Sequence, residues 1–264
     1  MRYVKLISHK RDRIIRKWHS PTTVHFSDFR DPKSVRAILD FAREHAALVD
    51  NLTGSRMMVV GMPNVGKSSL LNALRQHGVH KGKAAKTGAQ PGITRKIGTT
   101  VKIINGTGDS EGVYLIDTPG VFVPYVPDAE SMLKLALCGN IKDNIIAPTI
   151  LADYLLFHLN VQNPQLYREF SDPTNEVSVL LNGIAQKTGR LQKGGIPDLE
   201  ASSLWIIQRW RNGQLGKFVL DQVEADGLNK DILRHENMET SISQAHKLRK
   251  DSNRQRLKKP VLSN

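Results

Sequence analysis

The chain contains 264 residues, of which 39% are hydrophobic and 24% are charged, as is usual for a globular protein with its own core. A formal net charge of +13 favours an acidic partner, either nucleic acid or an anionic membrane surface, although a solvated basic surface explains it equally well. The single cysteine, Cys138, excludes an intramolecular disulfide. No apolar run reaches the roughly 18 residues that span a bilayer, so we expect no transmembrane helix.

The first 52 residues are predicted to form strands followed by a helix. We expect strands at Tyr3–Ile7 and Thr23–Phe26, separated by a loop, and then a helix over residues 31–49 with apolar residues at helical spacing. Pro32 falls in the first turn of this helix, where a missing amide hydrogen is tolerated. The basic, acid-poor residues 1–19 are also compatible with a mitochondrial presequence, but the run at 3–7 favours a buried strand.

The next segment, up to about residue 124, alternates strands and helices. The expected elements are a strand at Met57–Val60, a glycine-rich loop, a helix at Ser68–Gln76, and strands at Val101–Ile104 and Val113–Ile116. Alternation of this kind predicts an α/β fold with a mostly parallel sheet.

The pattern becomes helical after residue 126. Apolar residues recur at helical spacing around Met132–Leu137, Thr149–Phe157, Asn175–Gln186 and Asp198–Arg211. We therefore predict three parts: an α/β domain over residues 1–125, a smaller all-α domain over 126–223, and a polar, basic tail over 224–264 that we expect to be disordered.

Residues 61–68 match the Walker A pattern G-x4-G-K-S and lie between a predicted strand and a predicted helix, which is the context that the motif requires. The glycines let backbone amides turn inward around phosphate oxygens, and the helix N-terminus adds a partial positive charge. We expect Lys67 to contact the β- and γ-phosphates and Ser68 to bind Mg²⁺. These residues predict a nucleotide-binding P-loop.

A second motif, Asp117-Thr-Pro-Gly120, follows the next apolar strand and indicates nucleotide hydrolysis. Asp117 is placed to hold Mg²⁺ through water, and the amide of Gly120 is placed to meet the γ-phosphate. Thr94 lies in a loop between the two motifs and is expected to bind Mg²⁺ when a triphosphate is present. The predicted catalytic residues are thus Lys67, Thr94 and Asp117.

The element that reads guanine, Asn/Thr-Lys-x-Asp, normally follows the Asp-x-x-Gly motif, but no suitable match follows Asp117. Upstream, the strand expected at 3–7 leads into the loop Ser8-His9-Lys10-Arg11-Asp12. The strand expected at 23–26 ends at Ser27, where a loop that supports the base would follow. The motif order is therefore permuted, with the base loop before the P-loop.

This order resembles the circularly permuted ribosome-assembly GTPases of the YlqF type, most closely the mitochondrial ribosome-associated GTPase 1 branch, over roughly residues 3–222. The resemblance includes Pro91-Gly-Ile-Thr94 and the late Arg211-x-Gly213-x-Leu-Gly-Lys217 signature. It implies a circularly permuted P-loop GTPase domain followed by a smaller all-α domain. It places His9, Lys10, Asp12 and Ser27 at the guanine base, and Asn64, Val65, Gly66, Lys67, Ser68, Ser69 and Gly120 at the phosphates. Mg²⁺ is expected at Ser68, Thr94 and Asp117, and K⁺ at Asn64.

The resemblance also implies a function. The chain is expected to be a GTPase that is slow alone and stimulated by the ribosome, acting in assembly of the mitochondrial large ribosomal subunit. Its expected partners are GTP and GDP, the large subunit with its rRNA, and peripherally the mitochondrial inner membrane, on the matrix side. Basic residues in the segment 81–102 and near the C-terminus are candidate contacts to RNA phosphates.

Three departures from the family pattern keep alternatives open. His9 stands where Asn or Thr is usual, and Val121 stands where a water-orienting glutamine often sits. The strand–helix segment that precedes the base loop in relatives is missing, which a truncated start would explain. One alternative is therefore a catalytically impaired RNA-binding or scaffold protein with a remnant GTPase domain. The other is a P-loop enzyme that uses ATP.

Overall fold

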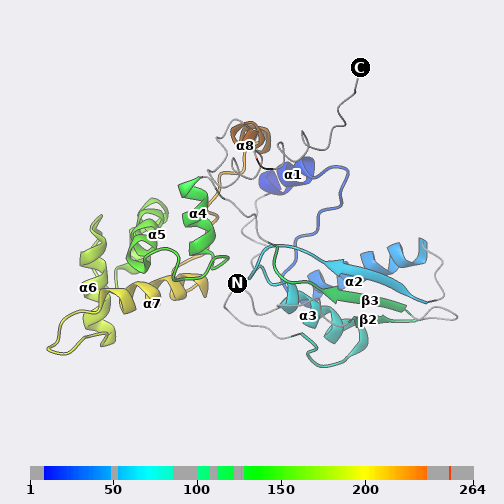
Figure 1. Ribbon diagram of the computed structural model, residues 1–264, viewed down its shortest axis with the longest axis horizontal. Coiled ribbons are helices and arrows are strands. Elements are labelled where there is room, and N and C mark those ends of the chain that lie inside the picture. Colours follow the sequence, from blue (N-terminus) through cyan, green and yellow to red (C-terminus); the bar gives the residue numbers. More distant parts are fainter. Residues whose placement is uncertain are drawn as a thin grey trace, which may run out of the picture.

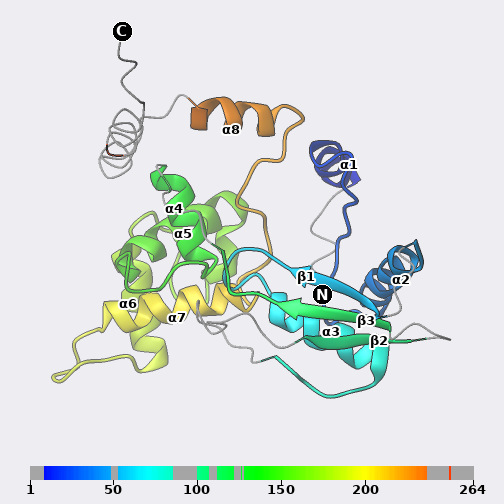
Figure 2. The ribbon, with the colours of Figure 1, turned by 45° about the vertical axis from the view of Figure 1, so that its right-hand side comes forward.

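The computed structural model describes residues 9–48, 53–85, 100–106, 112–121, 126, 128–236 and 250. Two regions lie side by side in it: a sheet region, residues 32–121, and a helical region, residues 128–220 (Figures 1 and 2). The strand expected at Tyr3–Ile7 and the Mg²⁺ ligand expected at Thr94 lie outside the described residues.

The sheet has three strands in the described part of the chain: β1 Ser55–Val59, β2 Val101–Asn105 and β3 Gly112–Asp117, in the order β1-β3-β2. β1 and β3 are parallel, with Val59 opposite Asp117, so the carboxyl ends of both strands meet at one edge. β2 and β3 are antiparallel, so the expectation of a mostly parallel sheet was wrong for these strands. The physical reason is the short connection between them, since a parallel pair needs a crossover of a dozen or more residues.

Two helices cover the sheet. α2 Pro32–Leu48 confirms the helix expected at 31–49, and α3 Lys67–Val79 follows the P-loop. The two helices pack against each other and bury Leu39 and Leu71 in a shared core with the strands. Gly78 permits the close approach of α3 to β2, because a Cβ there would overlap the carbonyl oxygen of Ile103. A helix that precedes the P-loop thus packs beside the helix that follows it, as the permuted order requires.

The helical region contains all four helices that the sequence predicts. These are α4 Ala129–Leu137, α5 Pro148–Gln162, α6 Val177–Thr188 and α7 Leu199–Arg211, with a short 3₁₀ helix at Pro164–Tyr167. α5 lies at the centre and packs against the other three. Its Leu155 and Leu159 are completely buried. Residues 128–220 contain only isolated bridges and no β-strand, as expected.

Two predictions for the start of the chain were wrong. Residues 23–26 form no strand in the described structure, and His9–Asp12 form no loop, because they begin helix α1 His9–Trp18. Arg16 and Asp12, four residues apart, form an ion pair of 2.9 Å that stabilises a helix rather than a loop.

The segment after the helical region also differs from expectation. Residues Gly227–Glu236, inside the part expected to be a disordered tail, form helix α8. The indole of Trp18 on α1 donates a hydrogen bond to the carbonyl of Ala225, just before α8. None of the described helices combines the length and the apolar character needed to cross a membrane.

Candidate nucleotide-binding site

The P-loop connects the carboxyl end of β1 to the N-terminus of α3. Two of its residues adopt the left-handed conformation: Asn64 with φ 59° and Gly66 with φ 93°. Gly66 occupies the N-cap position of α3 and, having no side chain, does not compete with an anion for the first amides of the helix. A helix N-terminus presented in this way binds phosphate through its N–H groups and its dipole.

Lys67 reaches back over the loop. Its ammonium donates hydrogen bonds to the carbonyl oxygens of Gly61, at 2.9 Å, and Met62, at 2.7 Å. These bonds hold the positive charge of Lys67 against the first residues of the loop. Lys67 is also the first residue of α3, whose N-terminus carries a partial positive charge of its own. The arrangement concentrates positive potential at one point, as a polyphosphate requires.

Ser68 and Asp117 come from different motifs and meet at the edge where β1 and β3 end. The hydroxyl of Ser68 donates to Oδ2 of Asp117 at 2.6 Å. Asp117 is only 4% exposed, and its Oδ1 is buried without a hydrogen-bond partner among the described residues. A buried carboxylate oxygen without a hydrogen-bond partner destabilises the folded state unless another group, such as a cation, interacts with it.

These two residues fit Mg²⁺. The ion prefers oxygen ligands and keeps several waters, using one or two protein groups together with substrate phosphates. The hydroxyl of Ser68 and the unpartnered oxygen of Asp117 supply such groups. Within the described residues no cluster of three or more His, Cys, Asp or Glu side chains is suited to a metal.

The segment after Asp117 contacts the end of β1 once and the P-loop twice. The hydroxyl of Thr118 donates to the carbonyl of Val59 at 2.7 Å, and the amide of Val121 donates to the carbonyl of Gly61 at 3.1 Å. Gly120 lies so close to Pro63 that a Cβ would approach its Cα to 2.6 Å. The two motifs therefore form one unit. The side chain of Val121 is 61% exposed and offers no polar group to orient a water.

A contact that the sequence did not predict joins the P-loop to the helical region. The carboxamide of Asn64 donates to the carbonyl of Gly139 at 3.1 Å, and that of Asn140 donates to the carbonyl of Pro63 at 2.7 Å. The only signal in the sequence is a Gly-Asn pair after a predicted helix. Asn64 therefore uses its amide nitrogen for the contact with Gly139.

The structure does not bring the predicted guanine residues to the P-loop. His9 and Lys10 are exposed on α1, Asp12 accepts from Arg16, and Ser27 is exposed in the segment before α2. Within the described residues, α1 contacts the segment 24–26 through Arg16, and Ala225 through Trp18. The phosphate residues Asn64, Val65, Gly66, Lys67, Ser68, Ser69 and Gly120, by contrast, all lie in or against the P-loop.

Comparison of sequences finds related proteins. Residues 56–183 match the family model described as 50S ribosome-binding GTPase. The chain is 42% identical over 195 residues to Mitochondrial GTPase 1 of Schizosaccharomyces pombe, covering 71% of this chain and 58% of that protein. It is 41% identical over 183 residues to Mitochondrial ribosome-associated GTPase 1 of Xenopus tropicalis, covering 64% and 58%. The chain thus spans less than two thirds of the length of these relatives.

Comparison of structures gives the fold. The GNP-bound crystal structure of YlqF from T. maritima matches with a TM-score of 0.56 and 20% identity, covering 84% of this chain and 79% of that one. A GDP-bound structure of TM YlqF matches with a TM-score of 0.53 and 18% identity, over 83% and 80%. The expected fold, a circularly permuted P-loop GTPase domain followed by helices, is therefore confirmed, and so is the resemblance that predicted it.

Proposed function

We propose that this chain, a homologue of the Mitochondrial GTPase 1 proteins, binds GTP at its P-loop and hydrolyses it to GDP and phosphate. The observation that carries the proposal is the meeting of Ser68 and Asp117, 2.6 Å apart, with one buried carboxylate oxygen left to a cation. A motif retained only for folding would not need an unpartnered carboxylate beside the phosphate loop.

In the proposed reaction, the amides of residues 64–69 and Gly120 bind the phosphates, and Lys67 neutralises charge on the transferred group. Ser68 and Asp117, with Thr94, hold Mg²⁺, which when bound neutralises the charge that develops on the phosphate oxygens. Because Val121 cannot orient the attacking water, we expect slow turnover by the chain alone and acceleration by the ribosome. Asn64 is the proposed K⁺ ligand.

Guanine selection remains assigned to His9, Lys10, Asp12 and Ser27. Since α1 does not contact the P-loop among the described residues, this assignment requires α1 to move toward the bound nucleotide. The segment 19–31 between α1 and α2 contains no helix or strand and would allow such a movement.

The proposed role is assembly of the large subunit of the mitochondrial ribosome, with its rRNA as partner. Two observations support it: the relatives are named mitochondrial and ribosome-associated GTPases, and the net charge of this chain is +13. We further propose a location on the matrix side of the inner membrane, in peripheral contact with it. The proposed domain limits are 1–125, 126–223 and 224–264, because the sheet region and the helical region have separate hydrophobic cores.

Phosphate release from GTP, measured with and without mitochondrial large ribosomal subunits, tests this function. Asp117→Asn removes the charge that holds Mg²⁺ and is expected to abolish hydrolysis. Asp153→Asn, an equal change at an exposed position of α5, is the matched control and should behave as the wild type. Tight GTP binding combined with turnover that large subunits fail to accelerate would contradict the assembly role.

The second candidate is a catalytically impaired RNA-binding or scaffold protein. It is favoured by the position of α1, which leaves the predicted base-reading residues away from the P-loop, and by Val121. Titration calorimetry with GTP and Mg²⁺ separates the candidates, because absence of binding at millimolar GTP supports the scaffold. Equal competition by ATP would instead support an ATP-using enzyme.

A further inference from the structure

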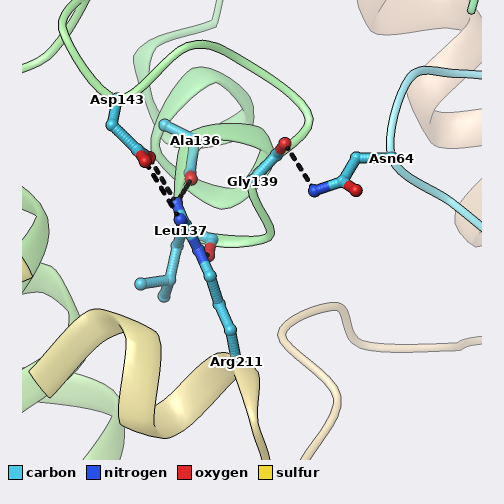
Figure 3. A network of polar contacts seen from close by, with 6 residues as sticks. All are labelled: Asn64, Ala136, Leu137, Gly139, Asp143 and Arg211. Carbon is cyan, nitrogen blue, oxygen red and sulfur yellow. Dashed lines mark hydrogen bonds and ion pairs between the residues drawn. The ribbon is translucent and has the colours of Figure 1, made fainter. Parts of the chain in front are cut away.

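The loop that follows α4, residues 138–143, is named here the junction loop, and it contacts the P-loop at two adjacent residues. Gly139 accepts from the side chain of Asn64 (Figure 3). Asn140 donates to the backbone of Pro63. One bond therefore runs in each direction between the regions. Gly139 and Asn140 are buried, with Asn140 only 7% exposed, so water competes little for either bond.

Arg211, at the end of α7, holds the junction loop from the other side. Its Nε donates to the carbonyl of Leu137 at 2.9 Å, and its Nη2 donates to the carbonyl of Ala136 at 2.8 Å. The same guanidinium forms an ion pair with Asp143 at 2.7 Å and is only 15% exposed. Arg211 thus satisfies carbonyls at the C-terminus of α4 and fixes both ends of the junction loop.

Gly139 lies where the two contacts meet. Its φ of 78° is left-handed, and a Cβ there would lie 3.1 Å from Nδ2 of Asn64 and 3.3 Å from Cζ of Arg211. The side chains of Asn64 and Arg211 therefore both approach the same backbone residue, as Figure 3 shows. Any shift of this residue changes its contact with both the P-loop and α7.

We propose that the junction loop positions the phosphate site, with Asn140 and Gly139 as positioning residues of the P-loop and Arg211 as their support. The helical region then completes the P-loop, since Pro63 and Asn64 are held from outside their own domain. A load on α7, such as a docked partner, changes the affinity of the P-loop for nucleotide, and nucleotide binding changes the junction loop by the same factor. The inference has two halves. The mechanical half states that Arg211 and the junction loop hold the P-loop in place. The nucleotide half states that this support changes nucleotide affinity, and only this half rests on the proposed function.

The mechanical half is tested without nucleotide, by hydrogen–deuterium exchange of the full chain. Arg211→Lys keeps the charge but loses the forked geometry that spans two carbonyls and a carboxylate. The side chain of Arg211 bonds to Ala136, Leu137 and Asp143, all outside the P-loop. We expect faster exchange in the peptides that cover residues 61–66. Asn212→Ala, the exposed next residue, is the matched control and should leave them unchanged. Wild-type exchange in Arg211→Lys would overturn the mechanical half.

The nucleotide half is tested by the dissociation constant for fluorescent mant-GDP with Mg²⁺. Asn140→Ala should weaken binding about fivefold, the usual worth of one hydrogen bond. Asn140→Ser serves as a second variant should the alanine variant fold poorly, which circular dichroism reports. Combining Arg211→Lys with Asn140→Ala should add little to the single effect, because both act on the same contact. Unchanged affinity, or fully additive effects, would overturn the coupling.

The two failures are distinguishable. If the wild-type chain binds no mant-GDP, the proposed function fails and the nucleotide half is overturned with it. The exchange experiment still decides the mechanical half, because it involves no nucleotide. If the wild type binds mant-GDP and the Asn140 variants bind equally well, the proposed function stands and only the coupling is lost.

Discussion

Helix α3 of the sheet region begins differently from helices α4 and α7 of the helical region. In the helical region, Asp128 caps α4 by accepting from the amide of Ser131, and Asp198 caps α7 by accepting from the amide of Ala201, each at 2.9 Å. In the sheet region, α3 begins at Gly66, with no side-chain cap. A protein carboxylate thus satisfies the N-termini of α4 and α7, whereas α3 presents its N-terminus to an external anion. Helices α4 and α7 are therefore complete without a ligand at their N-termini, and α3 is not.

The first prediction concerns the two hydrophobic cores, where truncation of a buried leucine should have the greatest effect on stability. Leu155 in the helical region and Leu71 in the sheet region are both completely buried. Each change to alanine should cost about 2–5 kcal/mol of unfolding free energy. Only Leu71→Ala should also weaken mant-GDP binding at temperatures where both variants remain folded, because Leu71 lies on α3. Urea denaturation and nucleotide titration measure the two effects.

Equal loss of nucleotide affinity in both leucine variants would contradict the independence of the two cores. It would mean that the helical core supports the P-loop as strongly as α3 does. A conservative pair, Leu155→Met and Leu71→Met, provides the control, because changes of this kind usually cost less than about 1.5 kcal/mol.

The second prediction concerns the uncapped helix. Gly66→Ala places a side chain at a φ of 93°, which costs about 1–2 kcal/mol and shifts the amides at the start of α3. We expect a loss of roughly tenfold or more in mant-GDP affinity, with a smaller effect on the unfolding of the helical region. Gly189→Ala, at a left-handed position that ends α6, carries the same backbone strain away from the site. An equal loss of affinity in both variants would contradict the assignment of Gly66 to the phosphate site.

The third prediction addresses the capped helix. Asp198→Ala removes the cap of α7 and should cost about 1 kcal/mol of unfolding free energy. Asp198→Asn keeps an accepting oxygen and should recover most of the loss. Nucleotide affinity should stay at the wild-type value, since the cap lies at the opposite end of α7 from Arg211. Asp172→Ala, at an exposed position, is the control, and an Asp198 effect no larger than this control would contradict the cap.

The helices and the phosphate motifs were predictable because their signals are local. α2, for instance, shows Val35, Leu39 and Ala42 at helical spacing, and packing in the core confirms that pattern. Residues 61–68 and Asp117 were predictable because phosphate and Mg²⁺ restrict residue types at fixed spacing. The sequence alone was sufficient to predict a helix or a phosphate motif wherever the apolar spacing or the motif residues lie within about a dozen positions.

The remaining features depend on contacts between distant residues. Gly139 and Asn140 meet the P-loop across about 75 positions, and a small and a polar residue after a helix leave no periodic trace. The start of α1 was misjudged because His9-Lys10-Arg11-Asp12 resembles a base-reading loop, while the pairing of Asp12 with Arg16 favours a helix. At these residues the motif resemblance predicted a loop and the local ion pair favoured a helix, and the structure has the helix.

The smallest expected effect is a pH dependence inside the helical region. Burial, together with the positive charge of Lys134, lowers the pKa of His158 below its usual value, against the opposing charge of Glu130. Its Nε2 is buried with no hydrogen-bond partner among the described residues, and its ring lies against Tyr154 and Phe218. Above the ordinary histidine pKa of about 6.5, the ring is neutral in both the folded and the unfolded chain, so stability is unaffected. As the pH falls below that value, the unfolded chain takes up the proton first, and the folded state loses stability until the folded pKa is passed.

His158→Phe keeps an aromatic ring without titration, so its melting temperature should fall less than that of the wild type between pH 7.5 and 5.5. We expect the difference to be about 1–2 °C by differential scanning calorimetry, with His19→Gln as an exposed control that follows the wild type. Identical slopes for His158→Phe and the wild type would show that protonation of His158 does not contribute to the pH dependence of stability.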